Sequence, residues 1–266
     1  MPLKVKDIDE TQAPLLDHLI ELRARLFRCV VAIGIAFGFC MWKAKYIFAL
    51  LVRPLAQAFP PGQGRLVYTK LYEAFFVEVK VALFAAFFVS FPIIANQLWA
   101  FVAPGLYARE KKAFLPFLIA TPILFAAGAS LAYFVVMPTA FKWFLGFQGN
   151  DAGLKQEALP AMGEYLDLVM RFILAFGVSF LLPVLMLLLN RAGIVSKEQA
   201  VRARRFVIVG IFIVAAVATP PDVASQLMLA VPLILLFEVS LWLMRPEAKM
   251  VSLRRDEDPA EAAPQA

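Results

Sequence analysis

The chain has 266 residues, of which 62% are hydrophobic and 17% charged, with a formal net charge of +6. A water-soluble core of this size does not need so much apolar material, and the apolar residues gather in long blocks instead of repeating at a helix or strand period. These features exclude an ordinary soluble domain and indicate a polytopic α-helical protein that resides in a lipid membrane. The positive charge is interpreted by its distribution along the chain, and no nucleic-acid partner is expected.

Six apolar blocks predict an all-α fold with six transmembrane helices in one membrane domain, residues 13–245. The blocks cover residues 26–42, 74–98, 113–137, 161–189, 206–218 and 226–244. Residues 1–12 are polar and are expected to form a flexible segment, and the charged, then Ala-, Pro- and Glu-rich tail of residues 246–266 is expected to be disordered. The first twenty-five residues lack the features of a cleavable signal peptide, so the first span is expected to act as its own insertion signal.

Residues 17–28 predict a charged helical arm that runs directly into the first span. Apolar residues recur on one face at helical spacing, and the polar residues share the other face. Glu21 lies four residues after Asp17 and four before Arg25. One interpretation is a helix-stabilising pair with Arg25, worth roughly 0.3–0.5 kcal/mol. The other is a poised acceptor for a ligand, because Asp17 repels Glu21 and Arg23 lies beside it.

Two further segments flank the second span. Residues 46–59 carry apolar side chains on one face and predict a short helix along the outer surface, bent at Pro54. In residues 96–112, Pro104 and Gly105 predict a turn. Glu110 follows among basic residues, either as a solvated member of a charge run or as a second acceptor on the same face as Glu21.

The last two spans are predicted to be short. The fifth block has only about thirteen apolar residues, roughly 20 Å of helix against a hydrocarbon core of ~30 Å, and the sixth has about nineteen. We therefore expect a concave, partly wet face on this side of the bundle. Asp222 is predicted to cap the sixth helix. Glu238 is deep in the sixth block, either as a functional group or as a residue near the inner interface.

The basic residues divide unevenly between the two predicted sides of the membrane. Seventeen Lys and Arg residues belong to the side that carries both termini, and seven belong to the other side. The positive-inside rule therefore predicts that both termini are cytoplasmic.

No cofactor or metal site is expected. His18 is the only histidine, which excludes a Ser-His dyad within the bilayer and a zinc-binding H-E-x-x-H helix. Cys29 and Cys40 have no metal-ligand spacing. The protein is therefore predicted not to be an enzyme. The alternative of a small-solute transporter or channel calls for ionisable residues in several spans and an internal repeat, and neither is clear in the sequence.

Several motifs in order along the chain resemble the TatC family, the multi-spanning subunit of the twin-arginine protein translocase. They are His18-Leu-Ile-Glu-Leu-Arg23, Trp99-Ala-Phe-Val-Ala-Pro104, Leu106-Tyr-Ala-Arg-Glu110, Ala132-Tyr-Phe-Val-Val-Met-Pro138, Ala175-Phe-Gly-Val-Ser-Phe180 and Thr219-Pro-Pro-Asp-Val223. Each motif is weak by itself, whereas together they extend over nearly all of the membrane part.

The resemblance implies a receptor that recognises the consecutive arginines of signal peptides on folded cargo at the cell inner membrane. It implies that Glu21 and Glu110 bind the two arginines, with Arg23 and Phe101 on the same surface. A guanidinium offers a planar fork of donors that a carboxylate can accept in a bidentate way, which agrees with the acceptor interpretation.

The resemblance also implies assembly with the single-span subunits TatA and TatB, together with self-association. Pro54, Asp222 and Gln226 match outer-side positions that matter for structure or assembly, and Glu238 is included with them as an intramembrane ionisable residue. One position departs from the family pattern. Leu181 stands where the family usually has Glu or Gln, so either the partner helix lacks the matching polar group or another residue supplies the contact.

Overall fold

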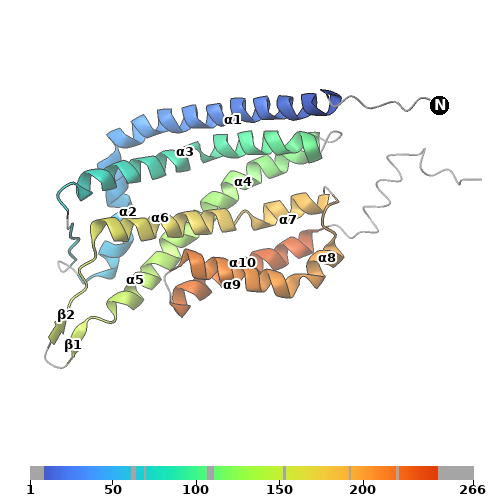
Figure 1. Ribbon diagram of the computed structural model, residues 1–266. Helices are drawn as coiled ribbons and strands as arrows, with labels where there is room; N and C mark the ends of the chain where they lie inside the picture. Colours follow the sequence, from blue (N-terminus) through green and yellow to red (C-terminus); the bar gives the residue numbers. More distant parts are fainter. Residues whose placement is uncertain are drawn as a thin grey trace, which may run out of the picture. The chain divides into compact units, whose positions relative to one another are not determined.

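The computed structural model describes residues 9–60, 64–68, 70–106, 111–151, 154–191, 193–219 and 222–244, and this part of the chain is mainly helical (Figure 1). The α-helices are α1 Asp9–Trp42, α2 Ala44–Ala58, α3 Glu73–Leu106, α4 Lys111–Leu131, α5 Met137–Leu145, α6 Met162–Ser179, α7 Leu182–Arg191, α8 Lys197–Arg202, α9 Arg204–Ala218 and α10 Val223–Leu243. A π-helical turn, η1 Ala132–Val136, joins α4 to α5, and the strands β1 Gly149–Asp151 and β2 Leu154–Gln156 form an antiparallel hairpin.

Five helical stretches among the described residues are long and apolar enough to cross a membrane. They are Leu19–Trp42, Glu73–Phe101, Pro116–Leu145, Met162–Arg191 and Val223–Leu243. These stretches correspond to the first four predicted spans and the sixth. The fifth corresponds to α9, whose 15 residues extend only about 22 Å. The helical membrane architecture is confirmed, whereas a sixth crossing and the side on which the termini lie remain predictions.

Three details differ from the sequence-based expectations. The sixth predicted helix is not short, because α10 has 21 residues, about 31 Å; the Asp222 side chain caps it and lets it begin three residues before the apolar block. The Pro104–Gly105 turn is absent from the described residues, since α3 continues through both to Leu106. The polar loop of residues 148–160 contains the β1–β2 hairpin, so the fold is all-α apart from this small sheet.

The chain divides into two compact units. The first consists of Met1–Phe48 and Glu78–Leu118. Its core lies where the second half of α1 and the start of α2 meet α3, through the buried residues Cys40, Ala44, Ala82 and Ala86. Small side chains at this contact let the helix backbones approach closely. The first half of α1, from Leu19 to Val31, is instead mostly exposed.

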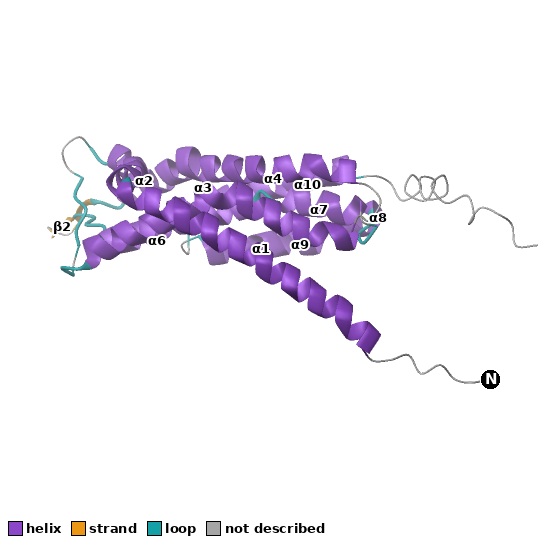
Figure 2. Cartoon of the chain, turned by 90° about the horizontal axis from the view of Figure 1, so that it is seen from above, coloured by secondary structure: helices purple, strands orange, loops and turns teal. Residues whose placement is uncertain are grey.

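The second unit consists of Ala49–Val77 and Ile119–Ala266. Helix α10 packs against both α7 and α9. The large side chains that are fully buried in this unit include Phe172 and Phe176 of α6 and Leu229, Leu233 and Phe237 of α10. Within this unit the β1–β2 hairpin and α8 lie at opposite ends, as the two perpendicular views show (Figures 1 and 2).

Candidate functional site

Glu21 lies on the exposed first half of α1 and is paired with Arg25, one turn further along. The Nε and Nη2 atoms of Arg25 donate hydrogen bonds of 2.9 and 2.5 Å to Glu21 Oε1. The Glu21 side chain is 39% exposed and the Arg25 side chain 19%. The helix-stabilising pair that the spacing allowed is therefore formed.

The same pair shows what the Glu21 carboxylate can still accept. Both hydrogen bonds from Arg25 end on Oε1, and no side chain that the structure describes donates to Oε2. A guanidinium from another molecule has two routes to this carboxylate, because it can use the unoccupied oxygen or displace Arg25. The pairing and acceptor interpretations of Glu21 are thus compatible.

The other three predicted recognition residues are described to different extents. Arg23 is exposed on the same arm as Glu21, and Phe101 is half-buried near the end of α3. Figure 1 shows the start of α1 and the end of α3 toward the same end of their unit. Glu110 lies outside the described residues, in the segment between α3 and α4. The proximity of the two predicted acceptor carboxylates therefore stays a prediction.

Pro54 lies inside α2, where its ring nitrogen has no proton to donate to the Leu50 carbonyl, four residues earlier. The Tyr133 hydroxyl replaces that donor, at 2.7 Å from the Leu50 oxygen. The Tyr165 hydroxyl donates to the next carbonyl, that of Leu51, at 2.8 Å. Two tyrosines from distant segments thus satisfy the backbone of α2 where the proline interrupts it.

The π-helical turn η1 contains one of these tyrosines, Tyr133. A π-helical turn adds a residue to a helix and so changes the direction in which its side chains point. The sequence assigned a role to Pro54 but to neither tyrosine, although Tyr133 belongs to one of the family motifs. Pro54 by itself predicts that one carbonyl of this helix lacks its usual donor. The sequence does not reveal which hydroxyl reaches that carbonyl.

Asp222 and Gln226 hold the beginning of α10. Asp222 Oδ1 accepts a hydrogen bond of 2.7 Å from the Ser225 backbone N–H, which confirms the predicted cap. Gln226 Nε2 donates to the Phe212 carbonyl at 3.2 Å and so joins α10 to α9. These contacts give both residues a structural role, and a role in assembly stays a prediction.

Glu238 forms an ion pair with the first residue of α9. Arg204 Nη2 lies 2.9 Å from Glu238 Oε2, with the two side chains 48% and 39% exposed. The carboxylate is therefore neither isolated nor deeply buried in the protein. Both interpretations drawn from the sequence, a functional group and a residue near the inner interface, stay predictions.

Glu73 makes a long-range contact that the sequence analysis did not identify. Its Oε1 accepts a hydrogen bond of 2.9 Å from the backbone N–H of Gly163, in the first turn of α6. Two backbone hydrogen bonds beside it join Val67 to Pro160 and Met162. The first N–H groups of a helix lack partners within the helix and favour a negative charge. Glu73 thus caps α6 from 90 residues away.

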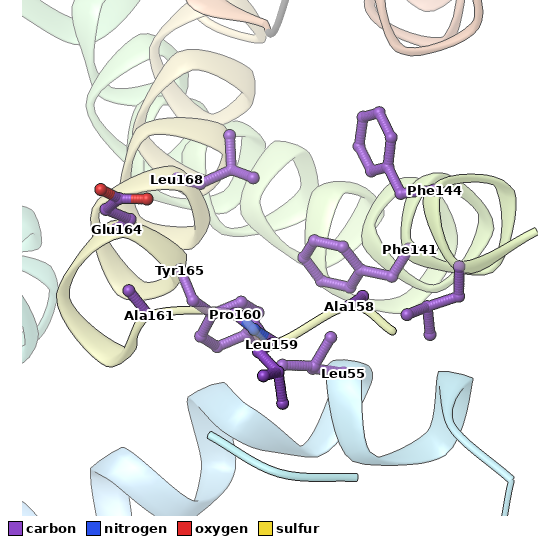
Figure 3. A pocket seen from close by; sticks show the side chains of 11 residues that line it. Leu55, Phe141, Phe144, Ala158, Leu159, Pro160, Ala161, Glu164, Tyr165 and Leu168 are labelled. Carbon is purple, nitrogen blue, oxygen red and sulfur yellow. The ribbon is translucent and has the colours of Figure 1, made fainter. Parts of the chain in front are cut away.

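A cavity of about 370 Å³ lies beside this junction (Figure 3). Apolar side chains such as Leu55 and Phe141 form most of its wall, and the Tyr165 hydroxyl is already bound to the Leu51 carbonyl. Glu164 is the only carboxylate among its lining residues. This lining suits an apolar group and lacks the several ionisable residues of a solute-transport site.

Leu181 lies in the short break between α6 and α7. Its N–H donates to the Val178 carbonyl, and its carbonyl accepts from the Leu185 N–H, both at 3.0 Å. The backbone is therefore satisfied at this position, while the side chain is half-buried and apolar. Glu164 is seventeen residues away along the chain, about 25 Å at helical rise, and does not replace the missing polar group.

Comparison with known proteins gives consistent results. Residues 17–232 match the family model described as Sec-independent protein translocase protein (TatC). A TatC protein of Magnetococcus marinus is 48% identical over 236 residues, covering 89% of this chain and 85% of the relative. A TatC protein of Escherichia coli strain K12 is 39% identical over 238 residues, covering 90% of each chain. A crystal structure described as the twin arginine translocase receptor TatC in DDM matches with a TM-score of 0.76 at 36% identity, covering 86% of this chain and 99% of that one.

Proposed function

Because this chain belongs to the TatC family of Sec-independent protein translocase proteins, we propose that it is the receptor for twin-arginine signal peptides in its translocase. Because members of this family are protein translocase subunits, the protein is a transport component and not an enzyme. The finer proposal concerns what it recognises, which is a pair of adjacent guanidinium groups at the start of a signal peptide.

The Glu21–Arg25 contact carries this proposal. It shows a guanidinium bound to the carboxylate by two nitrogen atoms, while no described side chain donates to the second carboxylate oxygen. Hydrogen bonds between charged partners contribute about 1.5–3 kcal/mol, more than an exposed ion pair without fixed geometry. Arg25 competes with the ligand for Glu21, so moderate affinity and reversible release are expected.

The length of α1 supports a position of Glu21 at the membrane surface. Trp42 is exposed near the end of the helix, and Lys43 Nζ lies 4.5 Å from the centre of its ring, an arrangement typical of a membrane interface. A hydrocarbon core of ~30 Å corresponds to about 20 helical residues. About 20 residues before Trp42 along the helix is Leu22. Glu21 is therefore expected in the headgroup layer on the opposite side of the membrane.

The second half of the proposed receptor surface rests on the family resemblance. Glu110 would bind the second arginine, and Arg23 and Phe101 would border the site. Two carboxylates on separate segments can test the spacing of two arginines, and each accepts the guanidinium fork in a way that an ammonium group does not reproduce.

The assembly follows from the same proposal. We expect the protein to span the cell inner membrane with both termini in the cytoplasm, where the greater number of its basic residues would lie. TatA and TatB are the proposed single-span partners, and self-association is expected. Because Leu181 carries no polar group, the contact at that position would be apolar or would use another residue.

Binding of a fluorescent twin-arginine signal peptide to the full chain in lipid nanodiscs tests the proposal. E21Q should weaken binding about tenfold or more, whereas R25Q should bind as tightly as the unmodified chain or more tightly, since it removes the internal competitor. E164Q, which neutralises an exposed carboxylate elsewhere, is the matched control. Unchanged affinity in E21Q, or equal affinity for a Lys-Lys peptide, would refute recognition of guanidinium by this carboxylate.

A further inference from the structure

A dense group of basic residues occupies the connection between α7 and α9, hereafter the basic turn. Its basic members are Arg191, Lys197, Arg202, Arg204 and Arg205. Residues 191–205 contain a single acidic residue, Glu198. The proposed signal-peptide site does not use this turn, which lies in the second unit, at the end opposite the hairpin (Figures 1 and 2).

The backbone of the basic turn is held by specific contacts. Gly193 adopts a positive φ of 72° after the last turn of α7, and the buried Asn190 side chain donates to the Val195 carbonyl at 3.1 Å. Ser196 and Gln199 form a reciprocal capping box at the start of α8, with bonds of 3.2 and 3.0 Å. These contacts fix the positions from which the basic side chains extend.

Three of the basic side chains have no acidic partner among the described residues. Arg204 is paired with Glu238, whereas Lys197, Arg202 and Arg205 form no ion pair with any described side chain. The Arg205 guanidinium instead lies 4.8 Å from the centre of the Phe206 ring. Positive charge is therefore available on the surface of this turn for an anionic ligand.

Large apolar side chains are exposed among these charges. Ile194, Val201 and Phe206 are 58%, 44% and 67% exposed. Basic and apolar groups side by side are typical of segments that lie in the headgroup layer, where the apolar groups enter the lipid and the cations contact phosphate. A loop surrounded only by water would gain nothing from exposed apolar side chains among its basic residues.

The short length of α9 brings the basic turn close to the lipid. Helix α9 begins at Arg204 and has 15 residues, about 22 Å, which is less than the ~30 Å hydrocarbon core. The sequence predicts α9 as the fifth span, and a span of this length causes local thinning of the bilayer or draws its flanking residues toward the acyl chains. Arg204 and Arg205 then meet lipid phosphates at the level of the headgroups.

We propose that the basic turn binds the headgroup of an acidic phospholipid, with Arg202 and Arg205 as its main cationic contacts. Charge complementarity, the exposed apolar flank and the short α9 favour a lipid over an acidic protein segment. One basic side chain near an acidic membrane surface favours association about fivefold, which corresponds to about 1 kcal/mol. Two such residues should therefore favour an acidic lipid by roughly 10- to 30-fold.

Native mass spectrometry of the full chain tests this proposal. The protein is equilibrated in detergent with equal amounts of phosphatidylglycerol and phosphatidylcholine, and the bound lipids are counted. The unmodified chain should retain phosphatidylglycerol preferentially, and R202Q/R205Q should lower that preference by roughly 10- to 30-fold. R202K/R205K, which preserves the charge, should keep most of it.

The control R53Q/R65Q removes two exposed arginines elsewhere in the same unit and should change the preference less than about twofold. Circular dichroism should show the same helix content in every variant. An equal loss of preference in the control would overturn the proposal, because the effect would then follow total charge. Absence of any preference in the unmodified chain would also overturn it and would leave an acidic protein segment as the candidate ligand.

Discussion

Replacing Tyr133 by phenylalanine tests how the protein accommodates Pro54. The substitution removes the hydroxyl that donates to the Leu50 carbonyl at 2.7 Å. Pro54 has no N–H with which to replace it, so the carbonyl loses its partner. Loss of a hydrogen bond at this exposed contact costs about 0.5–1.5 kcal/mol, and we expect Y133F to lower the melting temperature by about 1–6 °C.

The same substitution should cost much less when residue 54 can donate a hydrogen bond. In a P54A background the backbone N–H of residue 54 is available to the Leu50 carbonyl, as in an uninterrupted helix. Y133F should then cost less than about 0.5 kcal/mol. The two substitutions form a double-mutant cycle with an expected coupling energy of about 0.5–1 kcal/mol.

Thermal unfolding of the purified full chain in detergent, followed by far-ultraviolet circular dichroism, measures all four forms of the cycle. Y68F is the matched control, because Tyr68 is exposed and its hydroxyl makes no hydrogen bond with the described residues; it should change stability by less than about 0.5 kcal/mol. The reasoning is refuted if Y133F costs the same with and without the proline at position 54.

Two other substitutions test helix contacts in the second unit. A Cβ atom added at Gly128 would clash with the Phe176 backbone carbonyl of α6, so G128A should destabilise the protein by about 1–3 kcal/mol. G210A, at a glycine with open space around it, should remain close to unmodified stability in the same melting experiment, and equal effects would disprove the close approach of α4 and α6. E238Q weakens the exposed pair with Arg204 and should cost less than about 1 kcal/mol in chemical unfolding; a cost above about 3 kcal/mol would show that the pair is shielded from solvent.

The sequence alone determined where the membrane helices lie. Each transmembrane helix satisfies its own backbone hydrogen bonds and meets the lipid directly, so its presence depends on the residues of that segment alone. Five predicted blocks agree with the five described helical stretches that are long and apolar enough to cross a membrane, and the short fifth block agrees with α9. The Asp222 cap was predictable for the same reason, because donor and acceptor are three residues apart.

Helix ends and turns were less predictable where two local tendencies compete. Pro104 and Gly105 disfavour a helix, yet α3 continues through them to Leu106, because a membrane helix gains from every backbone hydrogen bond that it keeps. The expectation of a short sixth helix was wrong because the block was counted only from residue 226, whereas α10 already begins at Val223, directly after the Asp222 cap.

Contacts between distant segments came only from the tertiary structure. Tyr133 reaches Leu50 across 83 residues, and Glu73 reaches Gly163 across 90. Such contacts depend on how the helices pack and rotate, and the composition of each segment does not encode either property locally. The candidate receptor site shows the same division. The sequence predicted Glu21 at a membrane boundary and offered a pair with Arg25, whereas the structure shows that both hydrogen bonds of this pair end on a single oxygen.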